Sequence, residues 1–438
     1  MSLRPMDTTL KTRMAPSLGL LVIAQILRNE HTVIIEDENI SPINYSEKVD
    51  VVGITVTVNT LNRASEIAKK YKECGAITVG GGIHISSDPD NCEEFFDALC
   101  IGPSEQIWND IINDILNNKL QKRYYCSKLM CSEDIISPAY DLIDKKKYLY
   151  SNVIVTSYGC PFKCSFCYNS CQAYNNIYMN KPVDKVIEEI KLIGRKHIMF
   201  IDDNFIGNPQ WTRSLLKELT KLKVKWNAAV SCNIINMLDL LDEMKDSGCQ
   251  GLFIGFESLK TDVISNVNKG QNNVLMYEKL IKEIHNRGIM VNASFVFGLD
   301  GEDKRVFENT LDWIVKNKIE TVTSHILTPY PGTKLYNDFL RDKRITTFDY
   351  SKYDTSHVVY SPLNMTQEEL YNGYIKIYKK IYSIKNIIKR IPSSKSQRIP
   401  YLLFNIFYRK YGKITEFICN VISYERIGRL AERLSKYI

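Results

Sequence analysis

Apolar and polar residues alternate in blocks over the first 120 residues, in the order expected of a sheet covered by helices. Near-continuous runs of β-branched and apolar residues, such as VDVVGITVTV at 49–58, are typical of buried parallel strands. The expected elements are, in order, a helix at 17–30, strands at 31–40 and 49–58, a helix at 60–75, strands at 76–82 and 97–102, and a helix at 104–116. This alternation predicts a doubly wound, Rossmann-like α/β domain in residues 1–120.

A second, longer alternation follows a polar connector at 121–150. Six strands are expected, at 151–159, 197–202, 226–231, 251–258, 289–298 and 319–327. Five helices separate them, at 183–195, 208–222, 235–248, 272–288 and 303–317. Gly194, Gly248 and Gly288 stand where these helices end, as C-cap glycines do. The pattern predicts a parallel TIM-like barrel or partial barrel in residues 151–340.

Residues 341–438 are expected to form a mostly helical extension. Its stretch 365–391 opens with Thr366 and has Glu369 three residues later, which predicts a capping box. The extension is basic, because residues 371–438 hold 15 Lys and Arg against three Asp and Glu, a net charge of +12, and the rest of the chain carries −5. These helices either form a solvated lid that packs Ile and Tyr inward, or lie on an anionic membrane surface.

Overall composition is that of a globular protein, with 44% hydrophobic and 24% charged residues. The start of the chain shows no secretory signal, and the longest apolar stretches fall short of the ~18 residues that span a bilayer. We therefore expect a cytoplasmic protein. The alternative is a cytoplasmic protein that associates with a membrane through the basic extension. Disulfides are then not expected. Eight of the twelve cysteines are expected to be buried thiols, namely Cys74, Cys92, Cys100, Cys126, Cys131, Cys232, Cys249 and Cys419.

The remaining four cysteines lie within SYGCPFKCSFCYNSC, residues 157–171. With Cys171 as the fourth ligand they could form a closed structural zinc or ferredoxin-type site, since both kinds take four protein ligands. With Cys160, Cys164 and Cys167 alone, one iron of a cluster would lack a protein ligand. The loop follows the first barrel strand, at the end of the barrel where active sites assemble. The spacing by itself leaves both interpretations open.

The Cys-x3-Cys-x2-Cys pattern, with Phe166 before its last cysteine, resembles the radical S-adenosylmethionine (radical SAM) superfamily. Further stretches follow in that family's order, namely FIDDNF (200–205), GLFIGFES (251–258), VNASFVFGLDGE (291–302) and TPYPGTKLY (328–336). The resemblance covers about 150–340. It implies a 4Fe-4S cluster on Cys160, Cys164 and Cys167, with Cys171 as a bystander and the free iron binding S-adenosylmethionine.

The same resemblance implies contacts with S-adenosylmethionine, from Phe166, Asp202, Asp203, Glu257, Ser258 and Gly298. Read from the residues alone, Asp202 and Asp203 could instead cap the following helix, and Glu257 and Ser258 could face solvent at a strand end. Tyr158 and Tyr168 flank the cysteines, and packing is the simpler role for them. The other histidines, His31, His197, His285, His325 and His357, show no paired metal-ligand spacing.

The first domain is similar to the cobalamin-binding domain fused to many radical SAM enzymes, through MAPSLGLLVIAQIL (14–27), VVGITVTVNTLNRASEIA (51–68) and TVGGGIH (78–84). This implies cobalamin contacts from Leu18, Thr55, Val56, Gly80, Gly81, Gly82 and His84, although His84 could be a plain turn residue. No Asp-x-His-x-x-Gly motif occurs, so no protein histidine is expected on the lower cobalt face. Two departures stand out: residues 1–14 lack the usual first strand, and GPSE (102–105) replaces a GEGE-like turn.

The stretch YDTSHVVYSPLNMTQEEL (353–370) resembles the extension of the branch that contains hopanoid methylases. Together the resemblances imply a cobalamin-dependent enzyme that methylates an unactivated carbon of a small-molecule or lipid-like substrate through a 5′-deoxyadenosyl radical. An external low-potential donor such as a flavodoxin or ferredoxin would supply electrons. The alternatives are oxidation, cyclisation or ring rearrangement without methyl transfer, and a non-enzymatic metal or electron-transfer module. A nucleic-acid substrate is not expected, because the first domain lacks the cluster cysteines of RNA methylthiotransferases.

Overall fold

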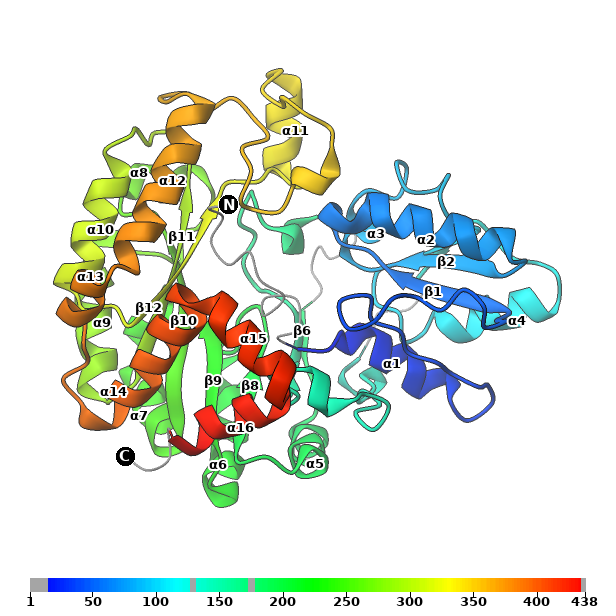
Figure 1. Ribbon diagram of the computed structural model, residues 1–438, viewed down its shortest axis with the longest axis horizontal. Coiled ribbons are helices and arrows are strands. Elements are labelled where there is room, and N and C mark those ends of the chain that lie inside the picture. Colours follow the sequence, from blue (N-terminus) through cyan, green and yellow to red (C-terminus); the bar gives the residue numbers. More distant parts are fainter. Residues whose placement is uncertain (1–14, 127–130, 172–177, 435–438) are drawn as a thin grey trace.

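The computed structural model describes residues 15–126, 131–171 and 178–434, and Figure 1 shows two α/β parts with a helical extension. The first part is built on a parallel sheet in the order β1-β2-β3-β4, with β1 at Val51–Thr55, β2 at Ile77–Gly81, β3 at Ala98–Ile101 and β4 at Arg123–Tyr125. Helices α1 (Leu18–Leu27) and α4 (Trp108–Leu116) cover one face, whereas α2 (Leu61–Glu73) and the short α3 (Ile83–Ser87) cover the other. The doubly wound arrangement is confirmed.

The second part is a six-stranded parallel sheet in the order β12-β11-β10-β9-β8-β5. Its strands are β5 (Val153–Ile154), β8 (His197–Phe200), β9 (Lys225–Val230), β10 (Cys249–Glu257), β11 (Met290–Phe297) and β12 (Thr321–Ile326). The connecting helices are α5 (Val183–Ile193), α6 (Pro209–Leu222), α7 (Leu238–Asp246), α8 (Thr261–Asn266), α9 (Tyr277–Asn286) and α10 (Val306–Lys316). Because β12 and β5 do not pair, the curved sheet is an open partial barrel, as expected.

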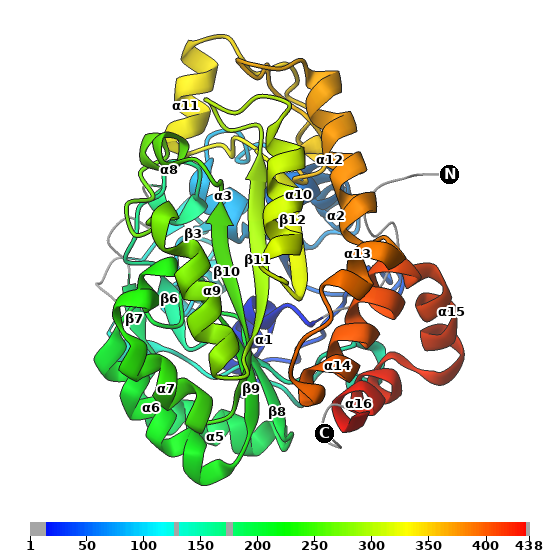
Figure 2. The same ribbon diagram turned by 90° about the vertical axis from the view of Figure 1, so that its left-hand side faces the viewer.

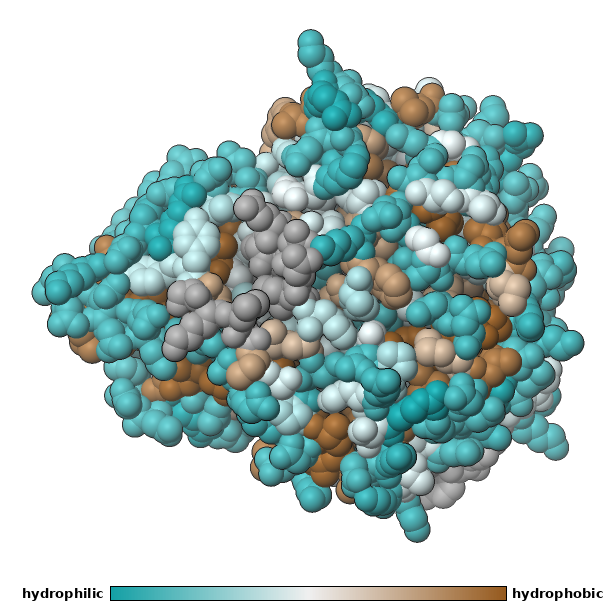
Figure 3. All heavy atoms as spheres, turned by 180° about the vertical axis from the view of Figure 1, so that it is seen from behind, coloured by the Kyte–Doolittle hydropathy of each residue, from teal (hydrophilic) through white to brown (hydrophobic). Residues whose placement is uncertain are grey.

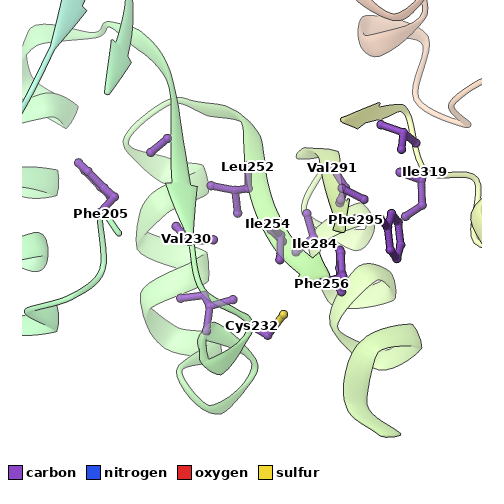
Figure 4. Packing of buried hydrophobic residues seen from close by; sticks show 14 of the residues in the cluster. Phe205, Val230, Cys232, Leu252, Ile254, Phe256, Ile284, Val291, Phe295 and Ile319 are labelled. Carbon is purple, nitrogen blue, oxygen red and sulfur yellow. The ribbon is translucent and has the colours of Figure 1, made fainter. Parts of the chain in front are cut away.

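The barrel core forms between the strands and their outer helices. Apolar side chains from β9, β10 and β11 meet those of α9 there, for example Leu252, Ile254 and Ile284 (Figure 4). At the strand ends the core contains aromatic rings. Those of Phe256 and Phe295 are stacked at a centroid distance of 6.1 Å. This packing fixes the carboxyl ends of the strands relative to one another.

The extension lies along the open side of the barrel. Its helices are α11 (Lys334–Arg341), α12 (Gln367–Ile381), α13 (Ile384–Lys389), α14 (Lys395–Leu402), a π-helical segment Leu403–Lys410, α15 (Gly412–Ile422) and α16 (Tyr424–Leu434), and Figure 2 shows α12 to α16 gathered on one side of the sheet. The capping box at Thr366 is confirmed. Next to β12, the buried Arg390 guanidinium donates to the Ile319 and Ile381 carbonyls.

Three differences from the sequence prediction concern the first part. Residues 31–40 form no strand, because β1 is the edge of the described sheet and no neighbouring strand pairs with that stretch. The missing first strand at 1–14 lies outside the described residues. Beyond residue 120, β4 extends the sheet into the expected connector. The buried-thiol prediction is wrong for Cys74 and Cys131, which are exposed, and Cys126 is half-buried.

The C-cap glycines supply a matched test of backbone strain. Gly248 has φ +103°, and a Cβ there would lie 2.2 Å from the Val224 carbonyl oxygen, whereas Gly288 has φ +69° with open space around its Cβ position. Gly288→Ala carries only the left-handed penalty of about 1 kcal/mol, and Gly248→Ala adds a clash with main chain. We expect Gly248→Ala to lower the urea midpoint clearly more than Gly288→Ala, followed by circular dichroism. Equal shifts would show that β9 moves freely to accommodate the methyl group.

Candidate active site

Cys160, Cys164 and Cys167 lie in a loop at the carboxyl end of the open barrel. The loop begins after β6 (Ser157–Gly159), which pairs antiparallel with β7 (Tyr178–Asn180). Burial, with smaller contributions from Cys164 and Asp203, raises the pKa of Cys160 to about 11 and that of Cys167 to about 12. The three thiols therefore lie within electrostatic reach of one another. Bringing them together as thiolates requires a positive partner such as iron.

Within the described ranges, no group of three or more His, Cys, Asp and Glu side chains could hold a metal ion. A four-iron cluster is a different case, since each cysteine binds a separate iron and the ligands stand further apart than those of one ion. Cys171 is buried and forms no disulfide.

A buried carboxylate fixes the start of this loop. Asp202, just beyond β8, accepts hydrogen bonds from the main-chain N–H groups of Thr156 and Ser157 at 2.7 and 2.5 Å. The two hydroxyl groups of these residues donate to the same carboxylate at 3.1 and 2.7 Å. Burial raises the pKa of Asp202 to about 6. The carboxylate is thus occupied by the protein, and the neighbouring Asp203, which accepts from the Tyr168 hydroxyl at 2.7 Å, is the exposed one.

A segment after α8 holds the middle of the loop. The Ser165 N–H donates to the Val267 carbonyl at 3.0 Å, and the Asn268 amide donates to the Lys163 carbonyl at 2.7 Å. The Gln271 amide lies 3.5 Å from Cys164 Sγ. A thiolate can only accept there, so Gln271 is placed to donate to the sulfur. Sequence reasoning missed this segment, since nothing in VNKGQ marks it as a partner of the cysteines.

Two pairs of interacting polar side chains lie at the ends of β10 and β11. Glu257, with φ +63°, forms an ion pair with Lys269 at 2.6 Å, and the Lys269 ammonium lies 5.8 Å from the Phe166 ring centroid. Ser258 donates to Glu302 at 2.7 Å, and the Gly298 N–H donates to the same carboxyl group at 3.0 Å. Burial raises the pKa of Glu302 to about 7. Four sequence-predicted residues thus meet here through Lys269 and Glu302, which the prediction did not include.

A cavity of about 360 Å³ separates the cysteine side of the barrel from the first part. From the first part it is lined by α1, by the ends of β1 and β2, and by the GPSE turn; from the barrel it is lined by the β6 region, Tyr168, Asp202 and Asp203. The GPSE turn matters most, because the buried Glu105 accepts a hydrogen bond from the Tyr158 hydroxyl across the cavity. Burial raises the pKa of Glu105.

The expected cobalamin residues divide into two groups. Thr55, Gly81 and Gly82 line the cavity, together with Gly19, Leu20 and Trp108, which the sequence did not single out. Leu18, Val56, Gly80 and His84 do not line it. Their side chains point elsewhere: Leu18 packs in the barrel core, Val56 in the first part, and a Cβ on Gly80 would lie 2.7 Å from the Phe96 ring. His84 is fully buried, with the Tyr350 ring at 5.3 Å, and burial lowers its pKa to about 4.

Comparison with known proteins places these features in a family. Residues 154–314 match the model of the radical SAM superfamily, and residues 12–112 match the B12 binding domain. The chain is 30% identical to bacteriochlorophyllide d C-12(1)-methyltransferase of Chlorobaculum tepidum, over 90% of this chain and 89% of the relative. The chain belongs to the cobalamin-dependent radical SAM methyltransferases. It is an enzyme, and its cofactors are a 4Fe-4S cluster, S-adenosylmethionine and cobalamin.

Two other relatives lie further away. Hopanoid C-2 methylase of Rhodopseudomonas palustris is 26% identical, over 76% of this chain and 66% of the relative. The solved structure of the methyltransferase TsrM from Kitasatospora setae, with cobalamin and a [4Fe-4S] cluster bound, superposes with a TM-score of 0.61 at 17% identity, over 75% of each chain. The likeness to TsrM concerns the fold.

The cavity has features that fit a large planar cofactor. Cβ atoms built on Gly19 and Gly102 meet no atom within 4 Å, so both glycines open onto free space. The buried indole N–H of Trp108, on the cavity wall, has no hydrogen-bond partner among the residues that the structure describes. A buried donor without a partner is costly, and a polar group of the cofactor would satisfy it. On the cysteine side, three thiolates suit a cluster with one iron open to S-adenosylmethionine.

Replacing Gly19 tests the cavity. We expect Gly19→Leu to fill space that the cofactor needs and to weaken cobalamin binding roughly tenfold or more, as overpacking does. Gly19→Ala, with a side chain one-quarter the size, is the matched control. Both residues favour helix, so stability should not fall. Equilibrium binding of hydroxocobalamin, followed by absorbance, measures the difference, and unchanged binding by Gly19→Leu would rule out this cavity.

Cysteine variants test the ligand set. After anaerobic reconstitution, Cys164→Ala should lose most cluster iron and sulfide, whereas Cys171→Ala should keep wild-type content and a spectrum that responds to S-adenosylmethionine. Iron and sulfide analysis with electron paramagnetic resonance measures both. If Cys171→Ala lost its cluster as Cys164→Ala does, all four thiols would be ligands and the iron would be closed.

Proposed function

We propose that this methyltransferase adds a methyl group to an unactivated carbon of an amphiphilic, largely apolar small molecule. The observation that carries the proposal is the full-length similarity to a bacteriochlorophyllide methyltransferase, together with a cavity lined both by the cobalamin-domain glycines and by the cysteine side of the barrel. The hopanoid methylase is a second relative with a large apolar substrate. The apolar wall residues Leu20, Ile23 and Trp108 suit such a molecule.

The bound cofactors supply a 5′-deoxyadenosyl radical and a methyl group. The protein's own residues hold the cluster, hold the loop that carries it, provide a positive charge beside that loop, and join the two walls of the cavity. Cys160, Cys164 and Cys167 hold the cluster, while Asp202 and the 267–271 segment hold the loop that carries them. Lys269, in its ion pair with Glu257, provides a positive charge beside that loop.

At the other wall, the Glu105–Tyr158 pair joins the two parts of the enzyme across the cavity. Because burial raises the pKa of Glu105, this carboxyl group can retain a proton at higher pH than an exposed glutamate. The pair therefore holds a proton at a fixed point on the cavity wall.

Electrons have to come from outside, and we propose a flavodoxin or ferredoxin as the donor. The cysteine loop supports this, since Lys163 is exposed next to Cys164 and the Tyr168 ring next to Cys167 is 36% exposed. A short path from the surface suits an acidic redox partner with complementary charge.

Product analysis separates methyl transfer from the alternatives. Reconstituted enzyme with cobalamin, reduced flavodoxin and S-adenosylmethionine labelled in its methyl group is incubated anaerobically with a chlorophyllide, a hopanoid or neither. Methylation predicts equal amounts of S-adenosylhomocysteine and 5′-deoxyadenosine, with label in the accepted substrate. Oxidation, cyclisation or ring rearrangement would yield 5′-deoxyadenosine with unlabelled product, and this result would overturn the proposal.

A further inference from the structure

The most apolar stripe of helix α15 faces outward. Ile414, Phe417 and Val421 are spaced i, i+3 and i+7, and their side chains are 57%, 69% and 71% exposed. Gly412 and Cys419, on the opposite side of the helix, are buried. An amphipathic surface helix normally turns its apolar stripe toward the core. This helix therefore exposes to its surroundings the kind of apolar stripe that other surface helices bury.

The stripe continues beyond the helix. Phe407 in the preceding π-helical segment and Tyr411 just before α15 are also exposed, seven and three residues before Ile414. We refer to Phe407, Tyr411, Ile414, Phe417 and Val421 as the apolar stripe. On the opposite face of the molecule, apolar residues lie in separate patches between hydrophilic ones (Figure 3). Large apolar side chains exposed together on neighbouring segments are a mark of a contact site.

Helix α12 provides the contrast within the same extension. Like α15 it contains three Ile residues, but its Leu370, Tyr374 and Ile377 are buried against the barrel. The Tyr374 hydroxyl even donates to the Ser324 carbonyl on β12. The inward-packing interpretation therefore holds for α12. It does not account for α15, whose Ile and Phe residues have no core to fill.

The surroundings of the stripe are basic. Lys413, Arg426 and Arg429 are exposed on α15 and α16, and residues 371–438 carry a net charge of +12. Two acids lie nearby: Glu416 is on α15 itself, and Glu425 lies in ion pairs with Arg195 and Arg429. Exposed apolar side chains bordered by Lys and Arg are the pattern of helices that lie in the interface of an anionic bilayer.

We propose that the apolar stripe of α15 docks on the surface of an anionic lipid bilayer. Charge decides between a bilayer and a second copy of the chain, because a symmetric pair through this face would bring two +12 extensions together, whereas anionic headgroups neutralise them. The contact is peripheral: within the described part of the chain, every helix is too short or too polar to cross a bilayer.

Docking in this way has a consequence for substrate access. The extension reaches from β12, where Asn405 donates to the Glu320 carbonyl, to the segment before β5, where Cys419 and Tyr424 pack on Leu149. Helix α15 thus sits at the open side of the barrel (Figure 1), and a docked enzyme turns that side to the bilayer. The consequence for substrate access rests on the proposed function, whose amphiphilic substrate would partition into lipid. The docking itself does not rest on the proposed function.

Vesicle binding tests the docking with the full-length holoenzyme. Wild type is sedimented with vesicles of phosphatidylcholine alone and of phosphatidylcholine mixed with phosphatidylglycerol. We expect binding to the anionic vesicles only, weakening as salt rises. The double variant Phe417→Ser with Val421→Ser should bind about tenfold or more weakly, since both side chains lose apolar burial. Leu275→Ser, which removes an 86% exposed leucine from the barrel surface, is the matched control and should bind as wild type does.

Three results would overturn the proposal. The first is wild type that fails to bind anionic vesicles, and the second is a double variant that binds them as well as wild type does. Alternatively, sedimentation without vesicles could show a dimer that only the double variant converts to a monomer, which would assign the stripe to a second copy. Cleavage of S-adenosylmethionine by the reduced enzyme in solution is measured in parallel. Its persistence in the double variant shows an intact fold and site, and its absence in wild type would count against the proposed function alone.

Discussion

The carboxylate of Asp202 is the contact on which the active site depends. It accepts four hydrogen bonds from two consecutive residues at the root of the cysteine loop, and so fixes where that loop leaves the barrel. The loop itself has little regular structure, and a loop without such an anchor would sample many positions. The segment that contains Asn268 and Gln271 then fixes its middle. Three thiols can only take up one cluster if both anchors hold, since the cofactor tolerates little displacement of its ligands.

The second constraint is the joint between the two parts. Glu105 and Tyr158 are 53 positions apart in the sequence. Their hydrogen bond joins the two walls of the cavity and sets the distance between the cobalamin domain and the cysteine side. A methyl donor on one wall and a radical source on the other must face the same carbon, so the width of this space is part of the chemistry. The GPSE turn supplies what the task requires: Gly102, whose φ is +90°, and a buried Glu105.

The hydrophobic period predicted both α/β parts because buried parallel strands and amphipathic helices leave strong, local signals. It failed at 31–40, where an apolar run has no partner strand and Ile34 remains 47% exposed. In the glycine run, successive strand residues face opposite sides of the sheet, so Gly80 faces Phe96 and Gly81 faces the cavity. The strand register determines which glycine faces the cavity, and the sequence alone does not give that register. Lys269, Gln271 and Glu302 could not be found at all, since their importance comes from contacts with residues far away in the sequence.

The extension shows how little composition says about environment. Helices α12 and α15 contain three Ile residues each, but α12 contributes to the barrel core while α15 exposes its apolar stripe. The difference follows from position: α12 lies on β12 and α10, where a sheet edge and a helix groove accept its side chains, and Gly373 lets it approach Phe307 closely. Helix α15 has only the thin layer around Cys419 beneath it. A helix with one small buried patch and a long apolar face outward gains stability only by finding another surface.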